Sequence, residues 1–259
     1  MRLEEMTVVA RQRSVGEVHD VALLLIRRHA VACLCLGLLG VLPWAVLDWW
    51  LVSLIDQPKV ACWLVLVLAF AQAPAAGAGL TAYLGAAMFE SRPTLRASVV
   101  AGFHAQKLLL LVALWRAVCA ASVVLLPWSA GYVAETVLLE RQNIRGAWRR
   151  ANALAAAARG SHLMHMVLAG ISVVVAVWIV DGTGHAFLGL LRSGELWGER
   201  EDLDVLPGHH VLPTIALWMA TVYITVVRFC AYIDARTRHE CWDIELDLRR
   251  AGARVAGHS

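Results

Sequence analysis

Long runs of apolar residues, separated by short polar segments, fill most of this chain. A helix that crosses a membrane needs about 20 consecutive, mainly apolar residues. Four runs have this character and each predicts one spanning helix: His29–Leu47, Val60–Met88, His162–Val180 and Val211–Ile233. The pattern therefore predicts an all-α, polytopic membrane helix bundle.

A fifth apolar run, Lys107–Leu139, is 33 residues long, which is too long for one ordinary crossing. Pro127, Ser129 and Gly131 cluster inside it, and such residues favour a turn. We therefore predict two limbs, the second starting at Trp128, and six transmembrane helices in all. The second limb is short, so a tilted neighbour or a locally thinner bilayer has to accommodate it.

Small residues recur every four positions in the second run, at Ala71, Ala75 and Gly79. This spacing lets helices approach closely, and we expect it to serve packing within the chain rather than homo-oligomerisation. Pro74 should bend the same helix.

Positive charge is distributed unevenly about the predicted spans. With six crossings, segments 1–28, 90–107, 140–162 and 234–259 share one side and carry 18 of the 23 Lys and Arg. Cytoplasmic loops are enriched in these residues, so this side is predicted to be cytoplasmic, with both termini on it. The acidic stretch Glu195–Asp204 then faces outward. A single crossing over Lys107–Leu139 would instead place the arginines between 141 and 159 outside.

Composition excludes several classes of protein. Hydrophobic residues make up 59% of the chain and charged residues 17%, and the mean hydropathy is +0.63. Soluble domains average roughly 45–50% apolar and about 25% charged, so a nucleic-acid binder or a disordered chain is not expected. The net charge of +3 adds little. Five of the six cysteines lie in or beside apolar runs without a CxxC, which favours buried thiols over disulfides, metal or redox use.

The cytoplasmic segments also carry amphipathic stretches. Apolar residues share one helical face within 15–28, after Pro93 (from Leu95 to Phe103), and in Gln142–Ala158. These predict three in-plane helices on the membrane surface, and the alternative is that they pack on the bundle itself. Candidate lipid head-group contacts are Arg145, Arg149, Arg150 and Arg228. Anionic lipid is the expected partner.

Three carboxylates each end an apolar run and are followed by an arginine: Glu90, Glu140 and Asp234. They suggest a threefold repeat of an in-plane helix and two spans over 15–89, 90–139 and 140–236, within a single membrane domain 1–259 that has a cytoplasmic tail, 237–259. Function in repeated membrane folds often lies at the repeat interface. The favoured alternative is that each carboxylate simply caps the next helix.

Two ionisable residues, Arg116 and Glu135, lie on either side of the predicted Pro127 turn. Their spacing places them at similar depth, so we predict an intramembrane ion pair. Fixing the hairpin is favoured as its role over a polar element in a substrate path. Arg228 lies near the predicted end of the last span, where its stem can extend toward the interface.

Motifs for catalysis and cofactor binding do not stand out. His162 and His165 share a helical face but have no acidic residue at ligand spacing, so interfacial histidines are favoured over a metal site. HExxH, GxSxG and phosphate-binding glycine loops do not occur in the sequence. We therefore expect no enzyme activity, no metal and no cofactor.

The segment Gly131–Glu140, followed by an arginine-rich helix and a glycine, resembles the membrane domain attached to some bacterial glycerophosphoryl diester phosphodiesterases. The segment Val227–Leu246 is similar to the ending of stand-alone six-helix bacterial membrane proteins. This resemblance implies a multi-pass protein of the bacterial inner membrane and a helix over Trp242–Leu248, where period-two alternation alone suits a strand. Phosphodiesterase activity is not implied, because the chain has no room for a barrel of about 250 residues.

Together these features predict a non-catalytic inner-membrane protein that serves as a subunit or scaffold in a bacterial envelope process, with envelope proteins as partners. The alternative is a transporter or lipid-handling protein that uses the repeat interface, and an enzyme is least favoured. A polar, water-accessible cavity among the first, third and sixth spans would support the alternative, whereas a sealed apolar interior would support a scaffold.

Topology is testable with reporters at Trp197 and Ser259. The charge distribution predicts that cysteine labels or reporter fusions at these two positions report opposite sides of the membrane. Labelling of both positions from one side would contradict the six-crossing arrangement.

Overall fold

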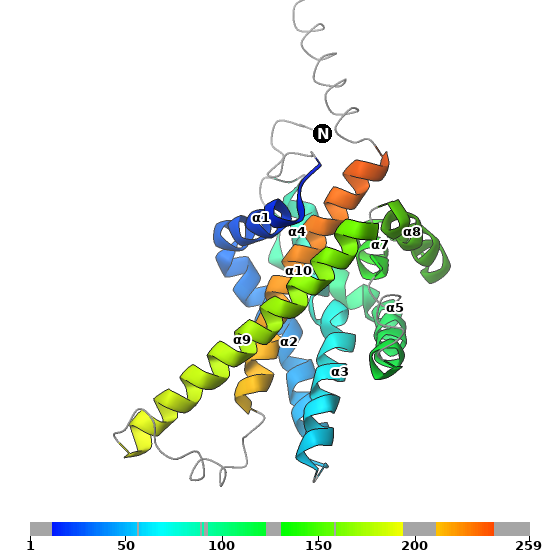
Figure 1. The fold of residues 1–259 in the computed structure, drawn as a ribbon. Coiled ribbons are helices and arrows are strands. Elements are labelled where there is room, and N and C mark those ends of the chain that lie inside the picture. The colour runs from blue at the N-terminus through cyan, green and yellow to red at the C-terminus, as the bar shows by residue number, and fades with distance from the viewer. Residues whose placement is uncertain are drawn as a thin grey trace, which may run out of the picture.

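The computed structural model describes residues 12–55, 57–88, 90, 93–122, 131–157, 159–193 and 211–240, and these parts contain helices and no strand (Figure 1). The helices are α1 (Val15–Arg28), α2 (Ala30–Val52), α3 (Pro58–Ala76), α4 (Ala78–Ala87), α5 (Leu95–Ser122), α7 (Val133–Leu139), α8 (Ile144–Ala157), α9 (Arg159–Ser193) and α10 (Val211–Glu240). The all-α prediction is confirmed for these residues. The segment Trp242–Leu248 lies outside them.

Five helical segments of the described chain are long and apolar enough to cross a membrane, which makes this a membrane protein: Ala30–Val52, Trp63–Ala87, Leu95–Ser122, Gly160–Gly184 and Ile215–His239. The sixth predicted crossing contains α7, which has only 7 residues. Seven residues span about 10 Å, a third of the hydrocarbon thickness of about 30 Å. The rest of that limb, 123–130, lies outside the described residues.

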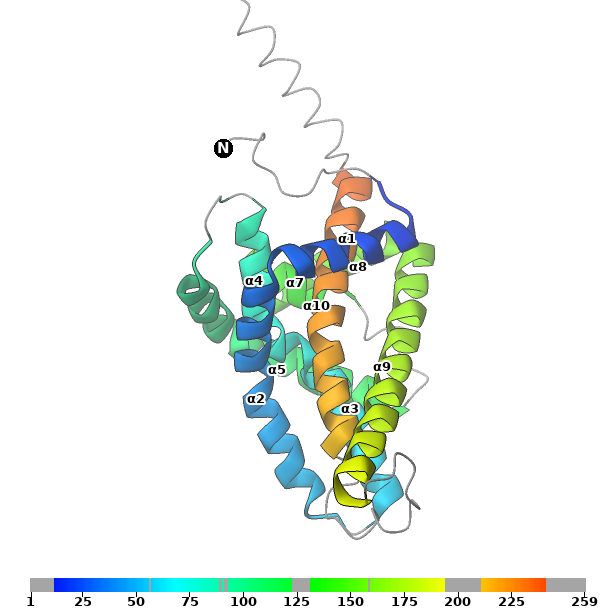
Figure 2. The same ribbon diagram turned by 90° about the vertical axis from the view of Figure 1, so that its left-hand side faces the viewer.

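The described ends of the chain nevertheless lie at the same end of the bundle. Figures 1 and 2 both place α1, α8 and the C-terminal end of α10 there, together with the start of α9. The C-terminal end of α4 lies at this end too. The chain therefore returns, after α5, to the end from which α5 departs, although α7 is short.

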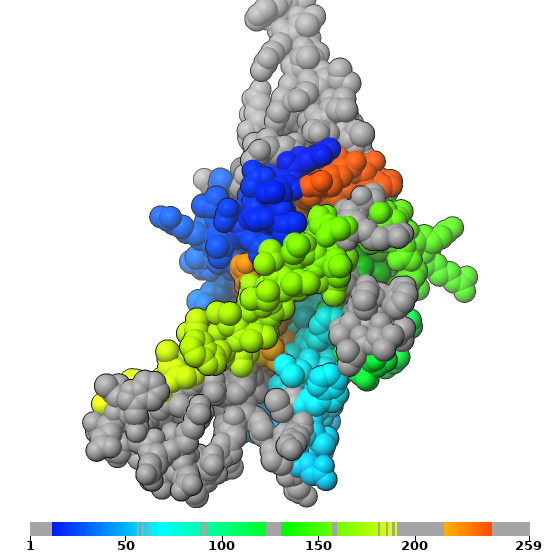
Figure 3. Space-filling view, in the orientation of Figure 1, coloured from blue at the N-terminus to red at the C-terminus, as the bar shows by residue number. Residues whose placement is uncertain are grey.

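Helix α10 is the centre of the bundle, whereas α9 lies on its outside. Of the most apolar part of each helix, 67% is buried in α10 and 6% in α9. Phe229 and Tyr232 of α10 are among the largest fully buried side chains. Figure 3 shows α9 crossing the surface of the molecule beside α3.

Helix α1 begins with a capping box, in which Ser14 Oγ accepts from the Glu17 amide and the Glu17 carboxylate accepts from the Ser14 amide. It crosses the end of the bundle (Figure 2) and buries Val18, Ala22 and Leu25. Its apolar face therefore packs on the protein itself.

Helix α8 buries its apolar face in the same way. Ala147, Ala151 and Leu154 are fully buried, while Arg145 and Arg149 are exposed. The apolar faces of α1 and α8 therefore pack on the bundle, which is the alternative to helices that insert this face into the membrane surface. The polar faces, and exposed side chains such as Leu23 and Leu24, can still contact lipid.

The predicted in-plane helix after Pro93 is not a separate element. Helix α5 runs without interruption from Leu95 to Ser122, so this stretch is the start of a spanning helix. Leu95, Val100 and Phe103 are exposed, with Phe103 at 77%, whereas Ser98 and Gly102 are buried and Val99 packs against the core. The amphipathic pattern therefore reflects a lipid-facing side and a small-residue side that packs on α4.

Small residues let the spanning helices approach closely. A Cβ on Gly102 would lie 2.9 Å from the Gly79 backbone nitrogen, and a Cβ on Gly40 would overlap the Ala76 carbonyl oxygen. Ala71 and Ala75 are both 2% exposed. These side chains therefore serve packing within the chain, with α5 lying along α3 and α4.

The close approach of α2 to α3 predicts that Gly40→Ala destabilises the protein. A methyl group there overlaps backbone, which cannot move aside as a side chain does, and overpacking of this kind costs about 1–3 kcal/mol. The matched control is Gly182→Ala on α9, where a Cβ meets nothing within 4 Å. The control should gain helix propensity and unfold no earlier than the wild type.

Thermal unfolding of the purified protein in detergent measures both effects. Equal midpoints for the two variants would show that α2 and α3 do not pack as closely as described.

Candidate functional site

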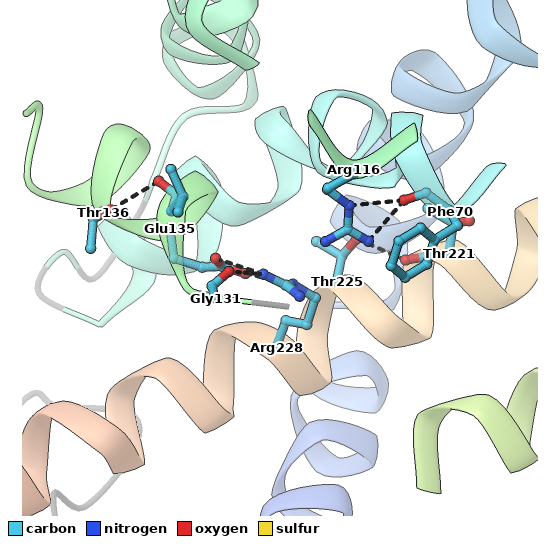
Figure 4. A network of polar contacts seen from close by, with 9 residues as sticks. Phe70, Arg116, Gly131, Glu135, Thr136, Thr221, Thr225 and Arg228 are labelled. Atoms are coloured by element: carbon cyan, nitrogen blue, oxygen red, sulfur yellow. Dashed lines mark hydrogen bonds and ion pairs between the residues drawn. The ribbon is translucent and has the colours of Figure 1, made fainter. Parts of the chain in front are cut away.

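A proline-induced defect in α3 organises the first part of the site. Pro74 has no backbone N–H, so it cannot donate to the carbonyl of Phe70 four residues earlier. Arg116 of α5 fills this place: its Nε and Nη2 donate to the Phe70 oxygen at 3.0 and 2.8 Å. Its guanidinium also lies 4.1 Å from the centre of the Phe70 ring (Figure 4). Arg116 therefore joins α5 to the bend in α3.

The second part is an ion pair between α7 and α10. Arg228 Nε donates to Glu135 Oε1 at 2.8 Å, and its Nη2 donates to Oε2 at 3.0 Å (Figure 4). Nη2 also donates to the Gly131 carbonyl at 3.1 Å. This bidentate geometry is the strong form of an arginine–carboxylate contact, and Glu135 is only 4% exposed.

The partner of Glu135 thus differs from the sequence prediction. The prediction was an ion pair between Arg116 and Glu135, whereas the bidentate partner of the carboxylate is Arg228 of the last span. Helix α10 runs on to Glu240, beyond the predicted end of that span at Ile233, so Arg228 lies well inside the span. Its side chain consequently turns inward to Glu135 rather than toward the membrane surface.

A cavity of about 280 Å³ adjoins this cluster, between α3, α9 and α10. Its walls are mostly apolar, and its polar lining in the described part of the chain is formed by six side chains: Arg116, Tyr132, His162, His165, Thr221 and Arg228. Two of these side chains are guanidiniums, and Glu135 is the bidentate partner of one of them, Arg228.

One wall of the cavity is formed by α9, the least buried of the candidate spans. Gly170 of this helix lines the cavity and is exposed, and a Cβ built on it meets nothing within 4 Å. The cavity therefore lies beside the most exposed helix of the bundle.

Glu140 ties the start of α8 to α10. It accepts from Tyr232 Oη at 2.6 Å and forms ion pairs with Arg150 at 3.4 Å and Arg236 at 3.9 Å. The cap of α8 is a different residue, Asn143, whose Oδ1 accepts from the Gly146 amide.

Asp234 lies within α10 and holds the segment that precedes α1. Its carboxylate accepts from the Arg13 amide and from Arg238 Nε, both at 2.7 Å. Glu90 is exposed between α4 and α5. Glu140 and Asp234 therefore do not cap a following helix, as the favoured alternative expected. Instead they join neighbouring segments of the chain to α10.

Two histidines meet where α1, α9 and α10 pack together. The rings of His19 and His165 stack at 5.6 Å, and His19 Nδ1 lies 2.7 Å from the Tyr223 hydroxyl. Burial lowers the pKa of the His19 imidazole, while the neighbouring Asp20 carboxylate raises it to a smaller extent. The described residues include no group of three or more metal-ligating side chains.

Sequence reasoning missed one polar pair in the spans. Asp48 of α2 is completely buried, and its Oδ1 accepts from Gln72 Nε2 of α3 at 3.0 Å. The predicted first span ended at Leu47, one residue earlier, whereas α2 continues to Val52. The apolar run from Trp49 to Val52 could have indicated that the helix continues past Asp48 and that this aspartate lies inside the span.

None of the protein-family models, curated proteins or solved structures compared with this chain matches it. The site therefore has to be interpreted from its own geometry.

Double-mutant cycles distinguish the two possible partners of Glu135. Glu135→Gln or Arg228→Met alone should lower the free energy of unfolding by about 3–5 kcal/mol, since each leaves a buried charge without its bidentate partner. The double variant should lose less than the sum of the single losses.

The comparison cycle combines Glu135→Gln with Arg116→Met, and unfolding in detergent gives each value. Coupling in this second cycle that equals or exceeds the first would overturn the assignment of Arg228 as the partner.

Proposed function

We propose that the protein binds an anionic amphiphile within the membrane, with the head group at Arg116 and Arg228 and the apolar part along the cavity walls. The observation that carries this proposal is a largely apolar cavity with two guanidiniums in its lining. The cavity differs from the expected one, because it lies between α3, α9 and α10 and its walls are mostly apolar. Its presence still favours the lipid-handling alternative over a scaffold with a sealed interior.

The charge and shape of the cavity support an amphiphilic ligand. Guanidinium groups suit phosphate and carboxylate oxygens because they remain charged and carry five N–H donors. Glu135 and the Gly131 carbonyl hold Arg228 in place, so its position is set before a ligand arrives. The volume of about 280 Å³ is near the lower limit of small-molecule pockets, about 300–1,000 Å³, which suits a head group and part of one chain.

The location of the cavity also supports this use. Helix α3 belongs to the first predicted repeat unit, 15–89, and α9 and α10 belong to the third, 140–236. A cavity between them lies at the boundary of two units, where repeated membrane folds place their ligands. The cavity also borders α9, the most exposed candidate span, so it lies near the side of the bundle that would face lipid.

We also propose the bacterial inner membrane as the location, with the end that carries α1 and α8 facing the cytoplasm. The positive charges of the sequence support this orientation, because the exposed Arg145 and Arg149 of α8 lie at that end. There they are placed to contact anionic head groups of the inner leaflet. We further propose that the chain is related to the stand-alone six-helix bacterial membrane proteins that it resembles, and that it contacts other proteins of the bacterial envelope.

A bulky side chain in the cavity wall tests ligand binding. Gly170→Trp places it at a lining residue where a Cβ has room, and Gly182→Trp is the matched control on the same helix, at a glycine where a Cβ has equal room and which is not among the lining residues. The full-length protein in detergent is titrated with a fluorescent lysophosphatidylglycerol, which has one chain and an anionic head group. Gly170→Trp should weaken binding at least about tenfold, while the control binds as the wild type does.

A fluorescent lysophosphatidylcholine, which has a zwitterionic head group, provides the charge comparison. Equal affinity for the two probes would contradict recognition by the arginines. Equal binding by the two tryptophan variants would show that the probe binds elsewhere.

A further inference from the structure

Asp48 and Gln72 form a polar pair that the ligand cavity does not use. Both side chains are buried, with Asp48 at 0% and Gln72 at 6% exposure. One hydrogen bond joins them, from Gln72 Nε2 to Asp48 Oδ1 at 3.0 Å. The two remaining oxygens, Asp48 Oδ2 and Gln72 Oε1, are also buried and accept no hydrogen bond within the described part of the chain. A buried acceptor without a donor is costly, so this arrangement requires an explanation.

The surroundings of the pair are apolar. Trp44 and Val52 lie one helical turn from Asp48 on α2, and Ala69 and Ala76 lie one turn from Gln72 on α3. The same cluster is completed from α9 and α10, by Val173, Val177, Leu217 and Trp218. Within the described part of the chain, Asp48 forms no ion pair, and its side chain has the single hydrogen bond to Gln72. An ionised Asp48 would therefore be a buried charge without a counter-ion among the described residues, which membrane interiors strongly disfavour.

We propose that Asp48 and Gln72 form a proton-binding site within the membrane, in which Asp48 is a neutral carboxylic acid that carries its proton on Oδ2 and donates it to Gln72 Oε1. A single proton then satisfies both acceptors, because a protonated carboxyl group is a donor as well as an acceptor. The acid and the amide become joined by two hydrogen bonds in place of one. A metal cation fits less well, since hard cations take about six oxygen ligands and this pair offers two.

The pair also links protonation to the packing of α2 on α3. When the proton leaves, the Oδ2–H bond breaks, the proton passes to water and a carboxylate remains. That carboxylate requires water or a counter-ion, so proton release requires α2 and α3 to separate near Asp48. The inference is independent of the ligand proposed for the cavity, since it rests on this pair and its apolar surroundings alone.

Infrared spectroscopy of the full-length protein in lipid bilayers tests the site. At pH 7 the wild type should show the carbonyl stretching band of a protonated carboxyl group, and Asp48→Asn should abolish it. The amide introduced by Asp48→Asn has the same shape and can still donate to Gln72, so this variant should fold and unfold like the wild type. Asp20→Asn, at an exposed carboxylate on α1, is the matched control and should leave the band unchanged.

Gln72→Leu provides a second, independent measurement. The acid in that variant has lost its acceptor, so its carbonyl band should remain and move to higher frequency. The absence of a protonated-carboxyl band in the wild type, or a band that persists in Asp48→Asn, would overturn the proposal. Repeating the spectra in sodium chloride and in choline chloride separates the proton from a metal cation. A wild type that lacks the band and is thermally stabilised by sodium alone would show that the site binds sodium instead.

Discussion

The ion pair between Arg228 and Glu135 is the contact on which the middle of this structure depends. Helix α7 is too short to cross a membrane, yet the chain has to turn back along it after α5. Two parallel hydrogen bonds from Arg228, and a third to Gly131, hold that short limb against the central helix α10. The same pair places a fixed guanidinium beside the cavity.

The wider principle is that polar groups inside the bundle are satisfied by one another. The carbonyl that Pro74 leaves without a helical donor is taken by Arg116, and Glu140 is taken by Tyr232. Asp234 holds the chain just before α1. Helix α10 supplies Tyr232 and Asp234 to these contacts and Arg228 to the ion pair with Glu135. The most buried helix therefore also binds the polar groups of distant segments.

The cavity and the Asp48–Gln72 pair are two polar features of the interior to which the proposals assign a ligand. At the cavity, two guanidiniums lie beside apolar walls, which suits an anionic amphiphile. At the aspartate, two buried oxygens accept no hydrogen bond in the described part of the chain, and a single proton satisfies both. The second feature matters because buried polar groups without partners are costly.

The sequence by itself determined the helices, because the length and period of an apolar run are local properties. It correctly gave the spans that became α2, α9 and α10 and the amphipathic faces of α1 and α8. Only the tertiary structure decided that Glu135 pairs with Arg228, that the face of α5 bearing Phe103 points outward, and that Asp48 is buried. The physical reason is that a residue's partner and burial depend on which helix packs against it. Helix ends that differ from the expected ones by five to seven residues were enough to move Asp48 and Arg228 from a predicted edge into the interior.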